Sequence, residues 1–299
     1  MADLGCGPGH VGAYLAERSV EIVGVDFSSG MVDQARRLFP ALEFVVGDML
    51  HLPFQDRSLA GAVAFYSIIH FDDAQLGQAF AEMARVLGRE GIVGLAFHVG
   101  DEVEHRDQWW DMPVVLDARF LPTAHVTSLL ERAGFGLLSV EERAPYAPEV
   151  EYQSRRAYVV ARPLTVLPNG ERLPAFGLGY PRTDLRRRLV DYVLNGNKIG
   201  TAGLAKHFAP DTHSPLPKPG DRWALLDYDD EAFAVVETTS IDVVPAGQVD
   251  LQFARDEGEG FESVADWRAA HERFWSDDNI TDETPIVCER FRVVERFDR

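Results

Sequence analysis

A glycine-rich turn near the start of the chain is followed by two carboxylates, each at or just after the end of an expected strand. The run Asp3-Leu4-Gly5-Cys6-Gly7-Pro8-Gly9 lies where a first strand would turn into a first helix. Glycines there permit a tight turn and a close approach of ligand to backbone, and the helix N-terminus adds partial positive charge. Asp26 closes the expected second strand and Asp48 follows the third. Carboxylates at these places accept hydrogen bonds from ribose hydroxyls and from an adenine amine, respectively.

The spacing of the glycines separates the candidate cofactors. A dinucleotide turn reads G-x-G-x-x-G, whereas this chain has His10 at the last position and Pro8 inside the turn. Glycines at 5, 7 and 9 therefore disfavour NAD. The alternative is a doubly wound domain in which the glycine turn is only structural.

Residues 1 to 162 resemble the class I methyltransferases that use S-adenosylmethionine (SAM), particularly the small-molecule branch. The resemblance implies an α/β Rossmann-like doubly wound sheet, SAM as cofactor, and a small-molecule or nucleoside substrate. It also implies that Asp26 holds the ribose and that Asp48 with Met49 frames the adenine. The cofactor-binding residues implied in this way are Asp3, Gly5, Cys6, Gly7, Asp26, Phe27, Met31, Asp48, Met49 and Phe65.

Catalytic residues are harder to assign, because methyl transfer needs mainly alignment and, for a protonated nucleophile, a base. His70 lies just beyond the fourth expected strand and His98 ends the fifth, so either is a candidate base. A hydrogen-bonded structural role is the alternative for both. Tyr66, Trp109 and Trp110 are candidates to line the substrate, with buried aromatic packing as the alternative.

The chain departs from the methyltransferase pattern at its start. Only Met1 and Ala2 precede Asp3, whereas similar enzymes carry a helix and the beginning of the first strand there. Two interpretations stay open. Either the true start lies upstream, or the domain lacks the segment that covers the cofactor.

Four ordered motifs in the second half resemble the ASCH domain, a small β-barrel related to the PUA fold, over about residues 172 to 297. They span residues 196–201, 219–222, 235–239 and 254–260, and Trp267 follows the last of them. Members of that superfamily are linked to RNA and nucleosides. Some hydrolyse the acetyl amide of acetylated cytidine with a lysine, a threonine and a glutamate.

The matching positions for that hydrolysis are Lys198, Thr201 and Glu257. A threonine hydroxyl is a weak nucleophile that needs a nearby base, and a buried lysine can serve. Residues 198 and 201 point to opposite faces of a regular strand, so we expect a bulge at Gly200. The alternatives are that Lys198 only binds a ligand and that Asp256–Gly260 is a solvated turn.

The elements that would position these residues follow from hydrophobic periodicity and turn signals. Alternating strands and helices over the first 100 residues predict a parallel sheet, and two later β-rich runs predict an antiparallel hairpin at its edge. The expected strands are 22–26, 43–47, 60–66, 91–98, 137–143, 156–161, 223–227, 232–238 and 287–294. The expected helices are 9–17, 29–37, 73–87, 122–133, 184–194 and 263–275.

Length and composition predict two domains. A chain of 299 residues exceeds the usual size of one core, and prolines and glycines after Arg162 suggest a linker. We therefore expect a methyltransferase domain at residues 1–163 and an ASCH domain at 164–299, the latter a small α+β domain with a PUA-like β-barrel.

Charge and cysteine content limit the partners and the location. The net charge of -19 disfavours binding of long duplex nucleic acid. No signal peptide or membrane-spanning run is apparent, so a cytoplasmic location without membrane partners is expected. Cys6 and Cys288 are the two cysteines, too few for a metal cluster, and no metal site is expected. The oligomeric state stays open.

The sequence as a whole leaves two functions to compare. One is an enzyme that methylates a small molecule or nucleoside and carries an ASCH domain for a nucleoside or RNA-base ligand. The other is a ligand-sensing protein whose shortened first domain is inactive. Affinity for SAM distinguishes them.

Overall fold

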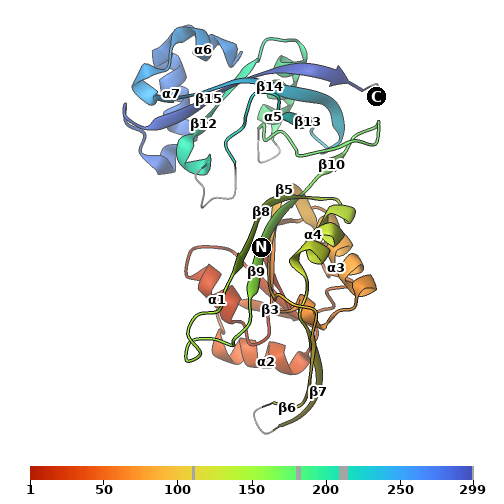
Figure 1. The fold of residues 1–299 in the computed structure, drawn as a ribbon. Coiled ribbons are helices and arrows are strands. Elements are labelled where there is room, and N and C mark those ends of the chain that lie inside the picture. Colours follow the sequence, from red (N-terminus) through yellow and green to blue (C-terminus); the bar gives the residue numbers. More distant parts are fainter. Residues whose placement is uncertain (110–111, 180–182, 209–214, 298–299) are drawn as a thin grey trace. The chain divides into compact units, whose positions relative to one another are not determined.

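The computed structural model describes residues 1–109, 112–179, 183–208 and 215–297, and the chain folds into two compact units (Figure 1). The first unit is Met1–Leu164 and the second is Thr165–Arg299. In the described part of the chain, none of the helices is long and apolar enough to span a membrane.

A seven-stranded sheet forms the centre of the first unit, in the order β3-β2-β1-β4-β5-β9-β8. Strands β1 to β5 run parallel, while β9 and β8 add to the edge in antiparallel fashion, which confirms the expected edge hairpin. The bounds of the strands are β1 (Ala2–Leu4), β2 (Val23–Asp26), β3 (Glu43–Val46), β4 (Leu59–Phe65), β5 (Leu87–His98), β8 (Phe135–Arg143) and β9 (Arg156–Pro163).

Among the described residues, four α-helices and one 3-10 helix accompany this sheet: α1 (His10–Ala16), α2 (Ser29–Leu38), η1 (Ile68–His70), α3 (Asp73–Val86) and α4 (Thr123–Arg132). Helix α3 begins with a capping box between Asp72 and Gln75. Its Leu76, Phe80 and Met83 recur at helical spacing and are fully buried in the main core. Helices α3 and α4 lie side by side (Figure 1).

Strand β1 is as short as the sequence indicates, and one further element of the first unit was not expected. Strand β1 has three residues, all buried, and pairs in parallel with β2 on one side and β4 on the other. A two-stranded antiparallel ribbon, β6 (Val103–Trp109) with β7 (Met112–Arg119), occupies a segment where no element was expected. The ribbon forms a sheet separate from the seven-stranded one.

The second unit is built on a four-stranded antiparallel sheet in the order β12-β15-β14-β13. Three α-helices, three 3-10 helices and a short ribbon accompany it among the described residues. The bounds are β10 (Thr165–Val166), β11 (Arg172–Leu173), α5 (Asp184–Leu194), β12 (Gly200–Leu204), η2 (Ala205–Phe208), β13 (Arg222–Leu226), β14 (Ala232–Pro245), η4 (Ala246–Gln248), α6 (Leu251–Asp256), α7 (Val264–Phe274), η5 (Ser276–Asp278) and β15 (Pro285–Arg296).

Each face of this sheet contributes to its own core. Phe291 of β15 packs with Leu189 and Val193 of α5, whereas Ile286 and Cys288 pack with Trp267 of α7. The alternation along β15 follows from the two-residue repeat of a strand covered on both faces.

The long strands of the second unit exceed the expected ones. Strand β14 continues to Pro245 rather than ending at residue 238, with a register shift between Thr238 and Ser240. Helix α6 was not expected at all. The described residues form an open sheet with β12 and β13 at its edges, and closure into a PUA-like barrel stays a prediction.

Candidate functional site

The glycine turn joins β1 to α1 and is fixed by contacts with neighbouring strands. Gly5, Gly7 and Gly9 have φ values of 70°, 50° and 89°, a region that favours glycine. A Cβ on Gly5 would lie 2.2 Å from the Cβ of Ser67. The Ser67 hydroxyl donates to the Leu4 carbonyl at 2.7 Å. The turn is thus held against the segment that follows β4.

Asp26 links the end of β2 to this turn. Its Oδ2 accepts from the backbone N–H of Gly7 at 2.7 Å, and its Oδ1 accepts from that of Ser28 at 2.8 Å. A carboxylate offers about four acceptor positions, so each oxygen keeps capacity for a ribose hydroxyl. A Cβ on Gly7 would meet no atom within 4 Å, which leaves the turn open to a ligand. These features fit an adenosine cofactor.

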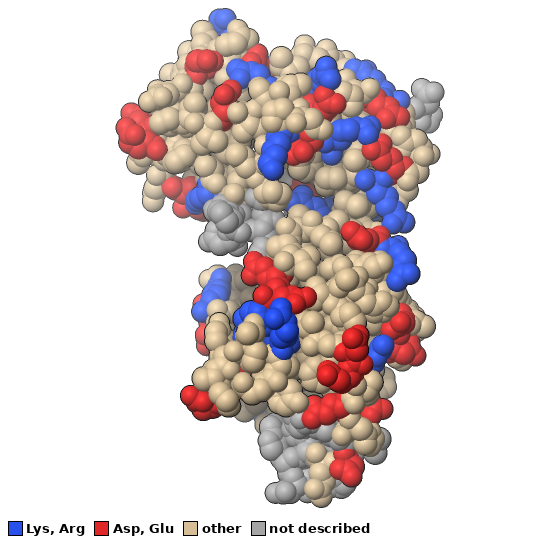
Figure 2. All heavy atoms as spheres, in the orientation of Figure 1, with Lys and Arg blue, Asp and Glu red and all other residues tan. Residues whose placement is uncertain are grey.

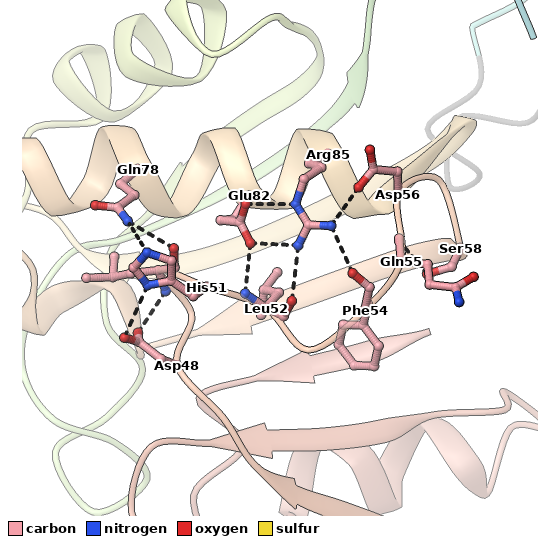
Figure 3. Close-up of polar contacts among 11 residues, drawn as sticks. Asp48, His51, Leu52, Phe54, Gln55, Asp56, Ser58, Gln78, Glu82 and Arg85 are labelled. Atoms are coloured by element: carbon pink, nitrogen blue, oxygen red, sulfur yellow. Dashed lines mark hydrogen bonds and ion pairs between the residues drawn. The ribbon is translucent and has the colours of Figure 1, made fainter.

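Asp48 and His51 lie just beyond β3. The Oδ1 of Asp48 accepts from the Leu50 N–H at 2.8 Å, and its Oδ2 is 3.8 Å from the Nδ1 of His51 (Figure 3). The Nε2 of His51 lies 3.2 Å from the amide nitrogen of Gln78 on α3. The Asp48 carboxylate is therefore held just beyond β3, and its contact with an adenine stays a prediction.

Arg85 of α3 fixes the loop that follows Asp48, a role that the sequence did not suggest. Its guanidinium donates to the carbonyls of Leu52 and Phe54 at 3.0 and 2.8 Å (Figure 3). It also pairs with Glu82 at 2.7 Å and Asp56 at 2.8 Å. The hydrogen bonds from Arg85 hold the pKa of Glu82 below its usual range.

The remaining predicted cofactor residues differ in exposure. The Cys6 thiol is buried with Val32 and Phe44, and burial raises its pKa to about 12, so only the backbone of Cys6 is available to a ligand. Phe27 and Met31 are exposed, at 81% and 46%.

The other two predicted residues are less accessible. Met49 is buried in the main core, and its terminal methyl would lie 3.5 Å from a Cβ on Gly5. Phe65 ends β4 and is partly buried.

The two candidate histidines have different surroundings. His70 in η1 is exposed, with its Nδ1 2.9 Å from the backbone oxygen of Asp117. His98 at the end of β5 is half-buried, with its Nδ1 2.6 Å from the Ser154 hydroxyl. The side chain of Trp109 and all of Trp110 lie outside the described residues, so their proposed substrate role stays a prediction.

Asp3 gives the first unit a pH-dependent contribution to stability. Burial raises the pKa of Asp3 to about 6, the hydrogen bond from the Gly12 N–H opposes that rise, and the charge of Asp26 adds to it. Because this folded pKa exceeds the unfolded value of 3.8, the folded state binds the proton more tightly. The stabilisation is complete below the unfolded pKa and is lost as pH rises through about 6.

We therefore expect Asp3→Asn, which stays neutral, to gain stability relative to the wild type as pH rises from 4 to 7, by up to about 3 kcal/mol. Urea unfolding of both proteins across that range measures the difference. A difference that does not change with pH would contradict the raised pKa.

In the second unit, residues 197–199 lie against the turn that follows α6. The Ile199 N–H donates to the Asp256 carbonyl at 2.7 Å, and a Cβ on Gly258 would lie 2.2 Å from the Asn197 carbonyl oxygen. Lys198 is 2% exposed, and its Nζ donates to Glu259 Oε1 at 2.7 Å and to the Glu257 carbonyl at 3.1 Å. This contact brings Lys198 next to the backbone of Glu257.

The side chain of Glu257 binds α7 instead of the lysine. It is 1% exposed, accepts from the indole N–H of Trp267 at 2.5 Å and lies 3.4 Å from the Nε2 of His271. Thr201 lies on β12 opposite Glu289 of β15. Within the described ranges, no hydrogen bond joins Thr201 to Lys198.

The expectation of a bulge at Gly200 is wrong. The pairing of β12 with β15 runs without a shift from Gly200 to Leu204, and Lys198 precedes the strand. Because Lys198 is outside the regular strand, strand alternation does not set the direction of its side chain.

The structure also reveals a buried polar group that sequence reasoning missed. The Thr238 hydroxyl donates to the Glu289 carboxylate at 2.6 Å and lies 3.1 Å from the indole nitrogen of Trp223. Burial raises the pKa of Glu289. The available signal was Thr238, a polar residue shortly after the apolar run 232–236 of β14. The neighbouring Glu237 instead pairs with Arg292 at 2.7 Å.

Comparison with known families identifies both units. Residues 1–91 match the family model described as a methyltransferase domain, and residues 178–295 match the model of the ASCH domain. The chain joins a methyltransferase domain to an ASCH domain. This family match supports SAM as the cofactor of the first unit. Contacts of the glycine turn, Asp26 and Asp48 with it stay predictions.

Curated relatives match the methyltransferase domain. The demethylmenaquinone methyltransferase of Beutenbergia cavernae is 39% identical over 86 residues, covering 29% of this chain and 35% of that protein. An O-methyltransferase of Pyrenophora dematioidea is 30% identical over 152 residues, covering 46% and 54%. The malonyl-[acyl-carrier protein] O-methyltransferase of Yersinia pestis is 27% identical, covering 42% and 47%. The chain thus spans about a third to a half of these relatives.

Among solved structures, a SAM-dependent methyltransferase from Methanosarcina mazei matches with a TM-score of 0.49 and 16% identity. The match covers 54% of this chain and 91% of that one.

Proposed function

We propose that the first unit transfers a methyl group from SAM to a small-molecule acceptor. The observation that carries this proposal is the position of Asp26, whose carboxylate binds the glycine turn and still has acceptor capacity for a ribose. SAM supplies a methyl group on a positively charged sulfur. The chain's own residues bind the cofactor and orient it toward the acceptor.

Each end of the cofactor has residues to hold it in this proposal. The open backbone at Gly7 leaves room for the methionine end, and Asp3 lies beside the turn. Asp48 receives the adenine, held in place by the loop that Arg85 binds. The exposed Phe27 and Met31 are available to cover the cofactor. The Cys6 contribution is limited to its backbone.

The names of the relatives support a small-molecule acceptor. Those proteins are named for demethylmenaquinone and for a malonyl group on acyl-carrier protein. Both names describe acceptors other than long nucleic acids. On the face drawn in Figure 2, Lys and Arg side chains alternate with Asp and Glu side chains in each unit. That distribution and the net charge of -19 favour a small acceptor over a duplex.

Asp26→Ala is expected to weaken SAM binding tenfold to a hundredfold, because a charged hydrogen bond contributes about 1.5 to 3 kcal/mol. Isothermal titration calorimetry of the full chain measures this change. Asp33→Ala on the exposed face of α2 is the matched control and should leave the affinity unchanged. Equal affinity in Asp26→Ala and the control would remove Asp26 from the site.

For the second unit, we propose binding of a nucleoside or RNA-base ligand beside Lys198, Thr201 and Glu257, with hydrolysis of an acylated amine as the associated reaction. The supporting observation is a lysine buried to 2% exposure whose segment is fixed by the tight contact at Gly258. A PUA-like barrel belongs to the same proposal. The competing function is a ligand sensor whose first unit is inactive. A failure of the chain to bind SAM would favour that function.

A further inference from the structure

His98 lies in a group of aromatic rings where β5 ends. Its ring centroid is 4.9 Å from that of Tyr66, 5.4 Å from that of Phe120 and 5.8 Å from that of Tyr152. The rings come from segments that are far apart in the sequence. Tyr152 is half exposed, and Phe120 and Tyr66 are partly exposed. The group therefore combines flat apolar surfaces with access from solvent.

The backbone at Tyr66 connects this aromatic group to the cofactor turn. Tyr66 has a φ of 57°, which is costly for an aromatic residue and is tolerated where surrounding structure enforces it. The next residue, Ser67, packs against Gly5 and donates to the Leu4 carbonyl. Tyr66 thus follows β4 directly beside the turn that receives the methionine end of the cofactor.

The polar contacts of His98 leave one ring nitrogen available. Nδ1 is 2.6 Å from the Ser154 hydroxyl, and Ser154 is buried. Nε2 has no hydrogen-bond partner among the residues that the structure describes. In the tautomer whose Nδ1–H donates its hydrogen bond to the Ser154 hydroxyl, Nε2 carries no hydrogen and is the basic nitrogen.

Burial, together with the charge of Arg156, favours the neutral form of the His98 imidazole. Burial lowers the pKa of His98 and the Arg156 guanidinium lowers it further, while Glu104 and Glu151 oppose that effect. Arg156 is buried and pairs with Glu151 at 2.8 Å. Burial raises the pKa of Tyr66 to about 12, so that hydroxyl stays protonated. A neutral imidazole is the form that accepts a proton.

We infer that His98 is the base for methyl transfer to a planar phenolic or enolic hydroxyl, whose carrier stacks on the solvent-exposed side of the rings of Tyr66, Phe120 and Tyr152. This inference rests on the proposed methyl transfer and adds the class of acceptor. The acceptor oxygen bonds the methyl carbon as the carbon–sulfur bond breaks, and the electron pair stays on sulfur to give S-adenosylhomocysteine. The hydroxyl proton passes to His98 Nε2 and then to solvent.

The aromatic rings around the His98 imidazole select the acceptor class. A phenolic or enolic acceptor has a flat ring or double bond that stacks on aromatic side chains. Its hydroxyl, with a pKa of about 10 for a phenol, is also far more acidic than that of a saturated alcohol and passes its proton to an imidazole more readily. His70, exposed and bonded to a backbone oxygen, has no such aromatic surroundings among its described contacts.

The test uses the full chain with SAM and three acceptors, namely phenol, catechol and cyclohexanol, and follows S-adenosylhomocysteine by chromatography. We expect product with the aromatic hydroxyls and none with cyclohexanol. His98→Gln should lower the rate at least a hundredfold, as expected for loss of a general base, without changing SAM affinity by calorimetry. His207→Gln in the other unit is the control and should keep the wild-type rate.

The pH profile separates catalysis from a structural role. The wild-type rate should fall at acid pH as His98 becomes protonated, with an apparent pKa below the usual histidine value. His98→Gln should lose this acid-side fall. Ser154→Ala should shift the acid-side fall while keeping part of the rate. An equal rate in His98→Gln and wild type, or loss of rate only in His70→Gln, would overturn the assignment. SAM binding without methylation of either aromatic hydroxyl would overturn it too, whereas failure of SAM to bind would overturn the proposed function itself.

Discussion

Gly258→Ala should destabilise the second unit by about 2 to 5 kcal/mol, because it combines a left-handed backbone with overlap against a neighbouring chain segment. Gly258 has a φ of 66°, and an added Cβ would lie 2.2 Å from the Asn197 oxygen and 2.7 Å from the Lys198 nitrogen. Both atoms belong to the backbone, so neither can move aside like a flexible side chain. Urea unfolding followed by tryptophan fluorescence measures the change.

Gly260→Ala provides the matched control for that experiment. Its φ of 87° is also left-handed, but a Cβ there would meet no atom within 4 Å. Gly260→Ala should therefore lower the free energy of unfolding only by the cost of a left-handed backbone for alanine, about 1 to 2 kcal/mol. Equal losses in the two variants would show that the segment carrying Lys198 is not packed against the turn at residues 256–258.

The second large effect concerns the proposed hydrolysis of acetylated cytidine. Lys198→Ala and Thr201→Ala should each abolish release of cytidine by the full chain, and the double variant should be no worse than either, because a nucleophile and its base act as a unit. Chromatography of the reaction mixture measures free cytidine. Lys206→Ala, at an exposed lysine paired with Asp278, is the control and should keep full turnover.

Several outcomes would revise that assignment. Equal product with the wild type and Thr201→Ala would exclude Thr201 as nucleophile. Binding of the nucleoside without product would make the domain a reader of the ligand instead of a hydrolase. Circular dichroism checks folding of Lys198→Ala, because removing the lysine leaves the buried Glu257 carbonyl and the Glu259 carboxylate without their partner. Lys198→Arg keeps the charge for comparison.

The sequence predicted those elements whose side chains repeat at a regular interval against a core. Helix α3 was predicted within one residue at its end, because Leu76, Phe80 and Met83 repeat at helical spacing. The ribbon of β6 and β7 was missed because polar and charged residues occupy β6 between Val103 and Trp109, and because the ribbon forms a sheet of its own. The extension of β14 to Pro245 was missed because polar residues follow Thr238 there.

For the candidate sites, the sequence predicted residue types better than it predicted contacts. Asp26 and Asp48 follow their strands as expected, because strand ends are fixed by periodicity. The hold of Arg85 on the loop after Asp48 was not foreseeable, since its partners include backbone carbonyls more than thirty residues earlier. Glu257 was chosen by its motif, yet its carboxylate binds Trp267 while its carbonyl meets Lys198. Tertiary packing alone decides whether the carboxylate or the carbonyl of Glu257 contacts Lys198.

The central claim is that the first unit binds SAM through a turn that rejects a dinucleotide. Calorimetric titration of the full wild-type chain with SAM and, in parallel, with NAD tests it directly. The account predicts saturable binding of one SAM per chain and no measurable binding of NAD. No heat of binding with SAM, or equal affinity for NAD, would contradict it.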